Sequence, residues 1–248
     1  MTQRAFATRK LFKLLRETPD APMGSLGDKR NRERSPKSMA AKCPESDVGK
    51  QSVLSERQGG SMDFPTLATE RLVLRELLPS DGADVLVFRG DPVVQKYDDP
   101  PLHTFQEASG FIEEMRQACA NQQQQIWAVT LEGSNTVIGL VSLQYWSHRG
   151  DQYHRRAEVG YGIARASWGQ GIGSEAVRAV AHYGFAELKL NRIYAGTIAD
   201  NHESVRLLEK LGFVREGTQR QHSLEDDGRF HDSAIYGLLR SEWGYDNP

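Results

Sequence analysis

Apolar residues recur along most of the chain after residue 70 with two distinct periods. A period of two residues predicts a strand, and a period near 3.6 predicts a helix. Alternating stretches predict seven strands, over residues 71–77, 126–131, 137–146, 156–164, 192–198, 213–221 and 231–239. Helical spacing predicts four helices, over residues 79–89, 104–121, 173–188 and 203–211. This order of elements is typical of an α+β fold that is built on a mixed sheet.

Short polar signals mark several ends of these elements. Glu107 follows Thr104 by three residues, which is the spacing of a capping box at a helix N-terminus. Residues 132–135 read Glu-Gly-Ser-Asn between two alternating stretches, and this composition predicts a hairpin turn. Gly212 follows the last predicted helix, at a position where glycine commonly ends a helix.

The most specific pattern lies in residues 157–175, where an alternating strand leads through a glycine-rich turn into a helix. Glycines spaced two apart let main-chain N–H groups crowd together, because no Cβ stands between them. The first N–H groups of a helix are unpaired and lie at its positive dipole end, which favours phosphate oxygens. We therefore expect a pyrophosphate site here. Its candidate ligands are groups of Ile163, Trp168, Gly169, Gln170, Gly171, Ile172, Gly173 and Ser174.

Two common phosphate motifs do not fit this stretch. A dinucleotide fingerprint runs Gly-x-Gly-x-x-Gly and places an acidic residue about 20 positions later. Here the glycines run Gly169-Gln-Gly171-Ile-Gly173, and the region about twenty residues on reads Asn191-Arg192-Ile193. The Gly-Lys-Ser/Thr of a nucleoside-triphosphate P-loop is also missing.

The segment Trp168-Gly-Gln-Gly171-Ile-Gly173 is similar to the coenzyme A loop of the GNAT acetyltransferases, whose pattern is Arg/Gln-x-x-Gly-x-Gly/Ala. Trp168 departs from the Arg or Gln at the first position. An aromatic residue there resembles the RimJ/RimL-type branch of the family.

A second block strengthens this resemblance. The family signature Asn-x-x-Ser-x-x-x-x-x-Lys-x-Gly-Phe is matched in register by Asn201, Ser204, Lys210, Gly212 and Phe213. The opening Leu67-Ala-Thr-Glu-Arg71-Leu-Val-Leu-Arg75 and the closing residues 236–243 also look like this branch, so the resemblance covers roughly residues 64–243. It implies a GNAT fold, with a mixed, mostly antiparallel sheet of about seven strands flanked by about four helices. It also implies acetyl-CoA as the co-substrate.

The resemblance places the thioester where the central strand splays from the next one, which makes Glu158 the candidate base. If the strand is regular, Glu158 shares a face with Gly160 and Gly162, and the two missing side chains leave room for a slender arm beside a carboxylate. A bulge would change which face the later residues occupy. The alternative role for Glu158 is an ion pair with Arg155 or Arg156 on a solvated face.

The resemblance also places Ser204 near the sulfur, which makes it the candidate proton donor to the thiolate. The alternative is a serine in the first turn of a helix that bonds to the backbone. Relatives outside this branch use a later tyrosine, so Tyr194 and Tyr236 stay open as donors. Asn201 is expected both to cap the helix and to contact pantetheine, since the two roles are compatible.

Charge divides the chain into two parts. Residues 1–61 hold 13 Lys and Arg against 7 Asp and Glu, whereas residues 62–248 hold 18 against 26. The first part is poor in apolar residues after Leu15, so we expect a disordered, basic N-terminal extension over residues 1–61 and the acetyltransferase domain over residues 62–248. Residues 4–16 are also compatible with a basic amphipathic helix, as in a transit peptide or a membrane- or RNA-touching arm. The favoured alternative is a non-conserved or mis-called N-terminal extension, with the real start at Met62.

Composition narrows the remaining functions. The two cysteines, Cys43 and Cys119, form no disulfide framework or metal motif, so we expect a cytoplasmic protein without a metal. No apolar run is long enough to span a membrane. The acidic balance of the domain argues against nucleic acid as a partner. We expect a monomer or homodimer that acetylates the amine of a small molecule or a peptide; the alternative is a non-catalytic acyl-CoA-binding or sensor domain.

Loops between the predicted elements are expected to select the acceptor amine. The candidates are residues 95–103, 147–154 and 225–229. Their acidic residues either attract a cationic amine or serve only solubility. These residues are Asp98, Asp99, Glu225, Asp226 and Asp227.

Overall fold

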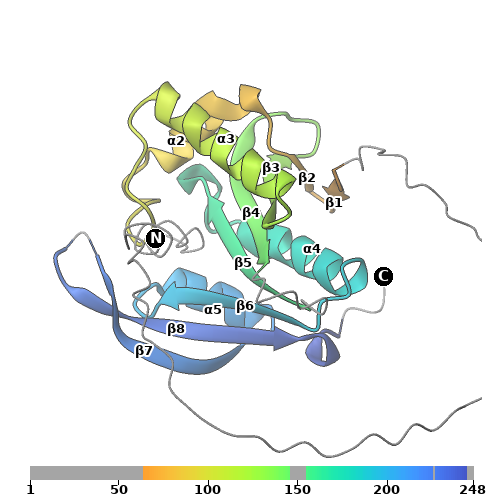
Figure 1. The fold of residues 1–248 in the computed structure, drawn as a ribbon, viewed down its shortest axis with the longest axis vertical. Helices are drawn as coiled ribbons and strands as arrows, with labels where there is room; N and C mark the ends of the chain where they lie inside the picture. The colour runs from red at the N-terminus through yellow and green to blue at the C-terminus, as the bar shows by residue number, and fades with distance from the viewer. Residues whose placement is uncertain (1–63, 146–154, 226, 245–248) are drawn as a thin grey trace, which may run out of the picture.

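The computed structural model describes residues 64–145, 155–225 and 227–244, which form eight strands and four α-helices (Figure 1). The strands are β1 (Leu67–Ala68), β2 (Leu72–Glu76), β3 (Gln124–Leu131), β4 (Val137–Tyr145), β5 (Arg156–Ile163), β6 (Arg192–Ile198), β7 (Val214–Leu224) and β8 (Phe230–Leu239). The helices are α2 (Gly82–Arg89), α3 (Phe105–Ala120), α4 (Ile172–Ala186) and α5 (His202–Lys210). Single 3-10 turns lie at η1 (Pro79–Asp81), η2 (Arg165–Ser167) and η3 (Arg240–Glu242).

The predicted α+β class and all eleven predicted elements are confirmed. The additional strand is β1, whose two residues pair with β2 and are too few to show a period. The capping box is present, because the Thr104 hydroxyl accepts from the Glu107 N–H at 3.1 Å and the Glu107 carboxylate accepts from the Thr104 N–H at 3.0 Å. Helix α4 begins one residue earlier than predicted, because Gly171 serves as its N-cap.

The eight strands form one sheet in the order β1-β2-β3-β4-β5-β6-β8-β7. Every neighbouring pair is antiparallel except β5 and β6, which are parallel and are connected through α4. A parallel pair requires such a crossover, whereas antiparallel pairs can be joined by hairpins. The predicted mixed, mostly antiparallel sheet is therefore confirmed.

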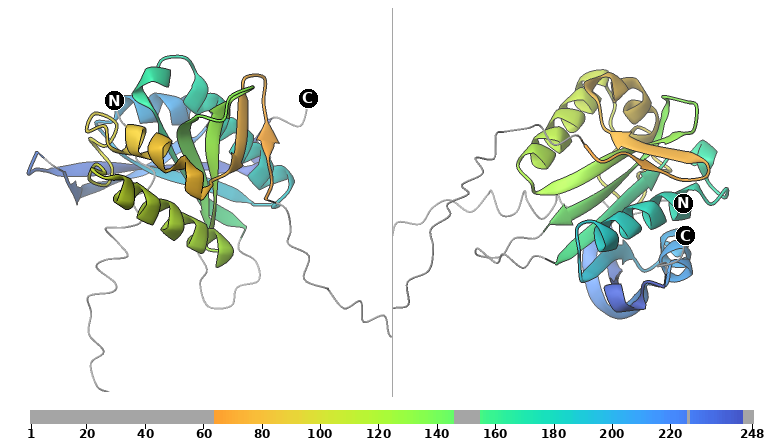
Figure 2. Two further views of the ribbon diagram at one scale, coloured as in Figure 1. Left: turned by 90° about the horizontal axis from the view of Figure 1, so that it is seen from above. Right: turned by 90° about the vertical axis from the view of Figure 1, so that its right-hand side faces the viewer.

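The helices cover both faces of the sheet (Figure 2). On one face, α2 and α3 pack over apolar residues of β3 and β4, among them Ile126, Ala128 and Leu140. On the other face, α4 and α5 pack over a larger apolar cluster that includes alternate residues of β5, namely Ala157, Val159, Tyr161 and Ile163. The intervening residues of β5, among them Glu158, Gly160 and Gly162, therefore face the α2/α3 side.

Strands β5 and β6 pair over only three residue pairs and then diverge (Figure 1). The last pair is Glu158 with Tyr194, although β5 stays paired with β4 as far as Ile163 and β6 stays paired with β8 as far as Ile198. We call this opening the β5–β6 fork. It leaves one edge of each strand without a neighbouring strand in the middle of the sheet.

Two predictions lie outside the residues that the structure describes. One is the disordered extension over residues 1–61, and the other is the acceptor loop over residues 147–154. Both stay predictions.

Candidate active site

The glycine-rich turn between β5 and α4 has the backbone that its sequence predicts. Gly169 and Gly171 have φ angles of 75° and 77°, in the left-handed region that disfavours other residues. The Glu175 N–H makes a helical bond to the Gly171 carbonyl at 3.0 Å. The N–H groups of residues 172–174 precede this bond and have no helical acceptor, so they are available to an anion at the start of α4.

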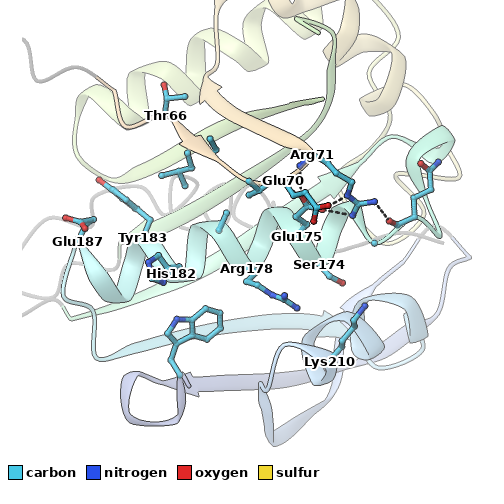
Figure 3. Close-up of a pocket in the computed structure, with 17 residues that line it drawn as sticks. Thr66, Glu70, Arg71, Ser174, Glu175, Arg178, His182, Tyr183, Glu187 and Lys210 are labelled. Carbon is cyan, nitrogen blue, oxygen red and sulfur yellow. Dashed lines mark hydrogen bonds and ion pairs between the residues drawn. The ribbon is translucent and has the colours of Figure 1, made fainter. Parts of the chain in front are cut away.

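Members of the turn differ in what they can offer a ligand. The Ile172 side chain is buried in the core, so only its backbone faces the turn. The indole N–H of Trp168 donates to the Ile163 carbonyl at 2.7 Å, which fixes the turn to the end of β5. Gln170, Gly171 and Ser174 line a groove of about 1030 Å³ along the outer side of α4 (Figure 3).

Glu158 lies at the vertex of the β5–β6 fork. The ladder between β4 and β5 runs without a register shift from Tyr145–Ala157 to Gly139–Ile163, so the predicted regular strand is present. The Glu158 carboxylate extends toward β6, where one oxygen lies 3.9 Å from the position that a Cβ on Gly196 would occupy. Burial raises the pKa of the neighbouring Tyr194 hydroxyl, and the Glu158 charge raises it further.

Ser204 lies in the first turn of α5 and is fully buried. Its hydroxyl is 2.8 Å from the hydroxyl of Tyr161, which projects from β5 on the same face of the sheet. Burial raises the pKa of Tyr161, against the hydrogen bond to Ser204, so the phenol keeps its proton. Tyr236, an open alternative as proton donor, instead donates its hydroxyl to the Glu209 carboxylate at 3.2 Å.

The hydrogen bonds of the Asn201 side chain indicate whether this site fits coenzyme A. Its side-chain oxygen accepts from the Ser204 N–H at 3.3 Å, so the predicted cap of α5 is present. Its side-chain nitrogen is buried and has no partner among the described residues. An unpartnered buried donor is costly and normally finds a partner. A carbonyl of a pantetheine arm would supply the missing acceptor, so Asn201 fits the cofactor that the glycine turn predicts.

The two candidate catalytic groups lie on opposite faces of the sheet. Glu158 faces the α2/α3 side, whereas Ser204 belongs to α5 and contacts the other face through Tyr161. At the β5–β6 fork the two strands no longer pair, so the sheet is open there. Groups from both faces of the sheet can therefore approach one thioester at this opening.

The predicted acidic acceptor loops have other partners. Asp98 and Asp99 lie 3.0 Å and 3.5 Å from the buried guanidinium of Arg89, so they neutralise an internal cation instead of attracting an amine or serving solubility. Asp227 of the β7–β8 turn lies 3.0 Å from His231 at the start of β8, and Asp200 lies 3.1 Å from the same ring. The hydrogen bond to Asp227, together with a smaller contribution from Asp200, raises the pKa of His231. Asp226 lies outside the described residues.

Three residues of the site were not predicted from the sequence. Thr69 and Arg71 contact Glu175 of α4, and Arg71 also contacts the Gln170 carbonyl (Figure 3). The segment that contains Thr69 and Arg71 was noticed only as part of a family resemblance. A threonine and an arginine at the edge of a sheet carry no local signal that would identify a partner about 100 residues away.

Among residues 64–145, 155–225 and 227–244, no group of three or more His, Cys, Asp or Glu side chains is arranged to hold a metal ion. No helix within these ranges is long and apolar enough to cross a membrane.

The glycine turn at the start of α4, the β5–β6 fork and the unpartnered amide at the start of α5 fit an acyltransferase that takes its acyl group from a coenzyme A thioester. The profile of the Acetyltransferase (GNAT) domain family matches residues 71–214. The chain is also 36% identical over 179 residues to the uncharacterized N-acetyltransferase p20 of Bacillus licheniformis, which covers 72% of this chain and 98% of p20. The chain therefore belongs to the GNAT acetyltransferase family.

Two further similarities concern acceptors. The putative ribosomal N-acetyltransferase YdaF of Bacillus subtilis is 39% identical over 108 residues, which is 44% of this chain and 56% of that protein. A crystal structure of spermidine N-acetyltransferase from Vibrio cholerae, in complex with CoA and spermine, has a TM-score of 0.61 and 25% identity. The alignment covers 71% of this chain and 99% of that one. The predicted family and enzyme class are thus confirmed, and the similarity to YdaF agrees with the predicted RimJ/RimL-like branch.

Proposed function

We propose that this acetyltransferase transfers the acetyl group of acetyl-CoA directly to a primary amine at the β5–β6 fork. The observation that carries this proposal is the position of Glu158 at the vertex of the fork, on the face opposite to α4 and the glycine turn. The donor enters from the α4 side and the amine from the α2/α3 side, so the two substrates meet at the end of the strand pair.

The residues of the fork divide the proton transfers between them. Acetyl-CoA supplies the acetyl group as a thioester, whose C–S bond breaks as the C–N bond to the amine forms. An ammonium group loses two protons when it becomes an amide. Glu158 takes the first proton and passes it to solvent, which leaves the amine lone pair free to attack.

Ser204 handles the second proton. Its hydroxyl gives a proton to the departing thiolate and receives one from the attacking nitrogen, so the serine ends unchanged. Tyr161 supports this role: its phenol keeps its proton, and we assign it as the donor in the 2.8 Å hydrogen bond to Ser204, which leaves the serine proton for the sulfur. Serine must receive a proton as it gives one, because proton transfer to the thiolate alone would leave a serine alkoxide. That transfer is unfavourable, since a thiolate is a much weaker base than an alkoxide.

The acceptor is an amine, either of a protein N-terminus or of a small molecule such as a polyamine or an antibiotic. Among the relatives, YdaF is named a putative ribosomal N-acetyltransferase, and the Vibrio cholerae enzyme is a spermidine N-acetyltransferase. Acetyl-CoA consumption by the full chain tests the proposal, with release of free thiol as the readout. The panel is spermidine, an aminoglycoside and peptides that begin with alanine or serine, and each peptide is matched by its N-acetylated form.

We expect turnover with at least one free amine and none with its blocked form. If acetyl-CoA binds but no amine in the panel is acetylated, the proposed transfer is contradicted in favour of a non-catalytic acyl-CoA sensor. If blocked peptides are consumed equally, the reaction does not occur at the amine.

Substitution of Ser204 by alanine is expected to lower kcat on the order of 10²-fold, because the relay to the sulfur is lost. It also leaves the buried Tyr161 hydroxyl without its partner, so the melting temperature falls as well. Tyr161→Phe is the matched control: it breaks the same hydrogen bond and costs similar stability but keeps the serine proton, so kcat should fall much less. Equal losses of kcat in the two variants would assign Ser204 a structural role only.

A further inference from the structure

The N-terminal edge of the sheet holds the cofactor turn through one carboxylate. The Glu175 carboxylate, in the first turn of α4, accepts from the Thr69 hydroxyl at 2.6 Å and from the Arg71 N–H at 3.1 Å. The Arg71 guanidinium donates to the same carboxylate through Nε at 2.7 Å and Nη2 at 2.5 Å. We call Thr69, Arg71 and Glu175 the edge clamp (Figure 3).

The edge clamp also reaches the turn itself. Nη1 of Arg71 donates to the Gln170 carbonyl at 3.0 Å, and Nη2 lies 3.6 Å from the place where a Cβ on Gly171 would sit. One planar guanidinium therefore contacts the turn on one side and the first turn of α4 on the other. Lysine cannot reproduce this arrangement, because its ammonium is a single point charge.

The sequence of the turn explains why it needs an anchor. Gly169 and Gly171 have nothing within 4 Å of an added Cβ other than Arg71, and glycine has the most backbone freedom to lose. If the turn becomes ordered only when the ligand binds, the free energy needed to order it lowers the affinity for the ligand. A fixed Gln170 carbonyl restricts the peptide planes that precede α4, and their N–H groups then face the ligand before it arrives.

The charge state of the clamp suits this role. Burial raises the pKa of Glu175, but the hydrogen bonds from Thr69 and Arg71 lower it by more, so the net shift is downward. Glu175 therefore stays ionised at neutral pH and holds the guanidinium in place. Its negative charge is matched by Arg71, so the start of α4 remains favourable for phosphate.

We propose that Arg71 is a positioning residue for acetyl-CoA, which fixes the pyrophosphate turn through the Gln170 carbonyl and Glu175. This inference rests on the proposed function, because it assumes that the turn binds acetyl-CoA. It assigns a role to Arg71 within the segment Leu67–Arg75, of which the sequence alone showed only that it resembles relatives.

The test measures acetyl-CoA affinity and thermal stability separately in the full chain, with acetyl-CoA itself as the probe. We expect Arg71→Ala to raise the Kd for acetyl-CoA about tenfold, which corresponds to the cost of ordering about one backbone residue. Arg71→Lys should not restore the affinity, because lysine retains the positive charge but lacks the planar set of N–H donors of the guanidinium. Arg71→Ala and Glu175→Ala disrupt the same clamp, so their effects should not add. The double variant should have a Kd no higher than that of the single variant with the higher Kd.

Arg75→Ala is the matched control. Arg75 lies on β2, four residues after Arg71, and makes a two-bond ion pair with Asp81 at 2.9 Å, but it does not contact the turn. Its loss should lower the melting temperature at least as much while leaving the Kd for acetyl-CoA unchanged.

Four results would overturn the proposal. An unchanged Kd in Arg71→Ala would make the clamp purely structural, and full rescue by Arg71→Lys would make charge alone responsible. An equal rise in Kd in Arg75→Ala would show that affinity follows general stability. Failure of the wild-type chain to bind acetyl-CoA would contradict the proposed function first, and the clamp proposal would fall with it.

Discussion

Replacing Gly171 by aspartate is expected to abolish the binding of acetyl-CoA while the domain remains folded. The residue is the N-cap of α4, and its φ of 77° is tolerated by asparagine and aspartate better than by other side chains. Aspartate is also a favourable N-cap residue. The new carboxylate, however, adds a negative charge to the turn that we propose holds the pyrophosphate. Two like charges about 4 Å apart near a protein surface cost roughly 4 kcal/mol, or about a thousandfold in affinity.

Thermal unfolding with and without acetyl-CoA measures this effect, because a ligand that binds only the folded state raises the melting temperature. We expect a rise for the wild-type chain and none for Gly171→Asp. Gly171→Asn has nearly the same shape without the charge and should retain part of the rise. Gly133→Asp is a second control, since Gly133 has a φ of 75° in the β3–β4 turn, away from the site. Equal stabilisation of the wild type and Gly171→Asp by acetyl-CoA would remove the glycine turn from the cofactor site.

Replacing Glu158 by glutamine is expected to lower kcat by about 10²–10⁴-fold with little change in the affinity for acetyl-CoA. The amide has the same shape as the carboxylate but cannot accept the proton, and general-base assistance is typically worth that factor. The loss should shrink at high pH, where the amine loses its proton without help. A plot of turnover against pH should therefore rise more steeply for the variant on the alkaline side.

Glu216→Gln is the control for a general effect of removing a carboxylate from this part of the sheet. Glu216 pairs with Arg192, which lies at the closed end of the β5–β6 pair, so its loss removes an ion pair without touching the fork. Its kcat should stay near the wild-type value. If Glu158→Gln also keeps near wild-type turnover at neutral pH with the amine that the wild-type chain acetylates, Glu158 is a structural ion-pair partner. The base is then ordered water or a carboxylate of a loop.

The two predictions separate binding from chemistry. Gly171→Asp acts on a main-chain anion site at the start of α4, so it should remove the cofactor and every later step. Glu158→Gln acts on a side chain at the fork, so it should leave the cofactor bound and slow the transfer. A variant of one class that behaves like the other would show that the turn and the fork do not serve the same reaction.

Local sequence determined the elements of this protein. Alternation placed seven of the eight strands, and the capping box at Thr104 marked a helix start that the structure contains. These features depend on backbone conformations and on contacts between residues a few positions apart, so the sequence reports them directly. The glycine turn belongs to the same class, because its φ angles and helix start are local properties.

Register and pairing across the sheet were decided only by the tertiary structure. The sequence indicated that Glu158 shares a face with two glycines, but not that pairing with β6 stops at Glu158. The same limit applies to the acidic residues of the loops, because the sequence could not show that Asp98 and Asp99 pair with the buried Arg89. Ser204 was a candidate without a visible partner, and Tyr161 was only a strand residue, until the fold brought their hydroxyls together.

The edge clamp shows the physical reason most clearly. Thr69 and Arg71 lie about 100 positions before Glu175, and each is an ordinary polar residue in its own segment. Nothing in a short window distinguishes an arginine that will meet a solvent-exposed acid from one that will hold a cofactor turn. The sequence by itself indicated which backbone segments are candidates to bind a pyrophosphate and carry a base. The fold decided which distant side chains hold those segments in place, because such contacts exist only after the sheet edge and α4 have packed together.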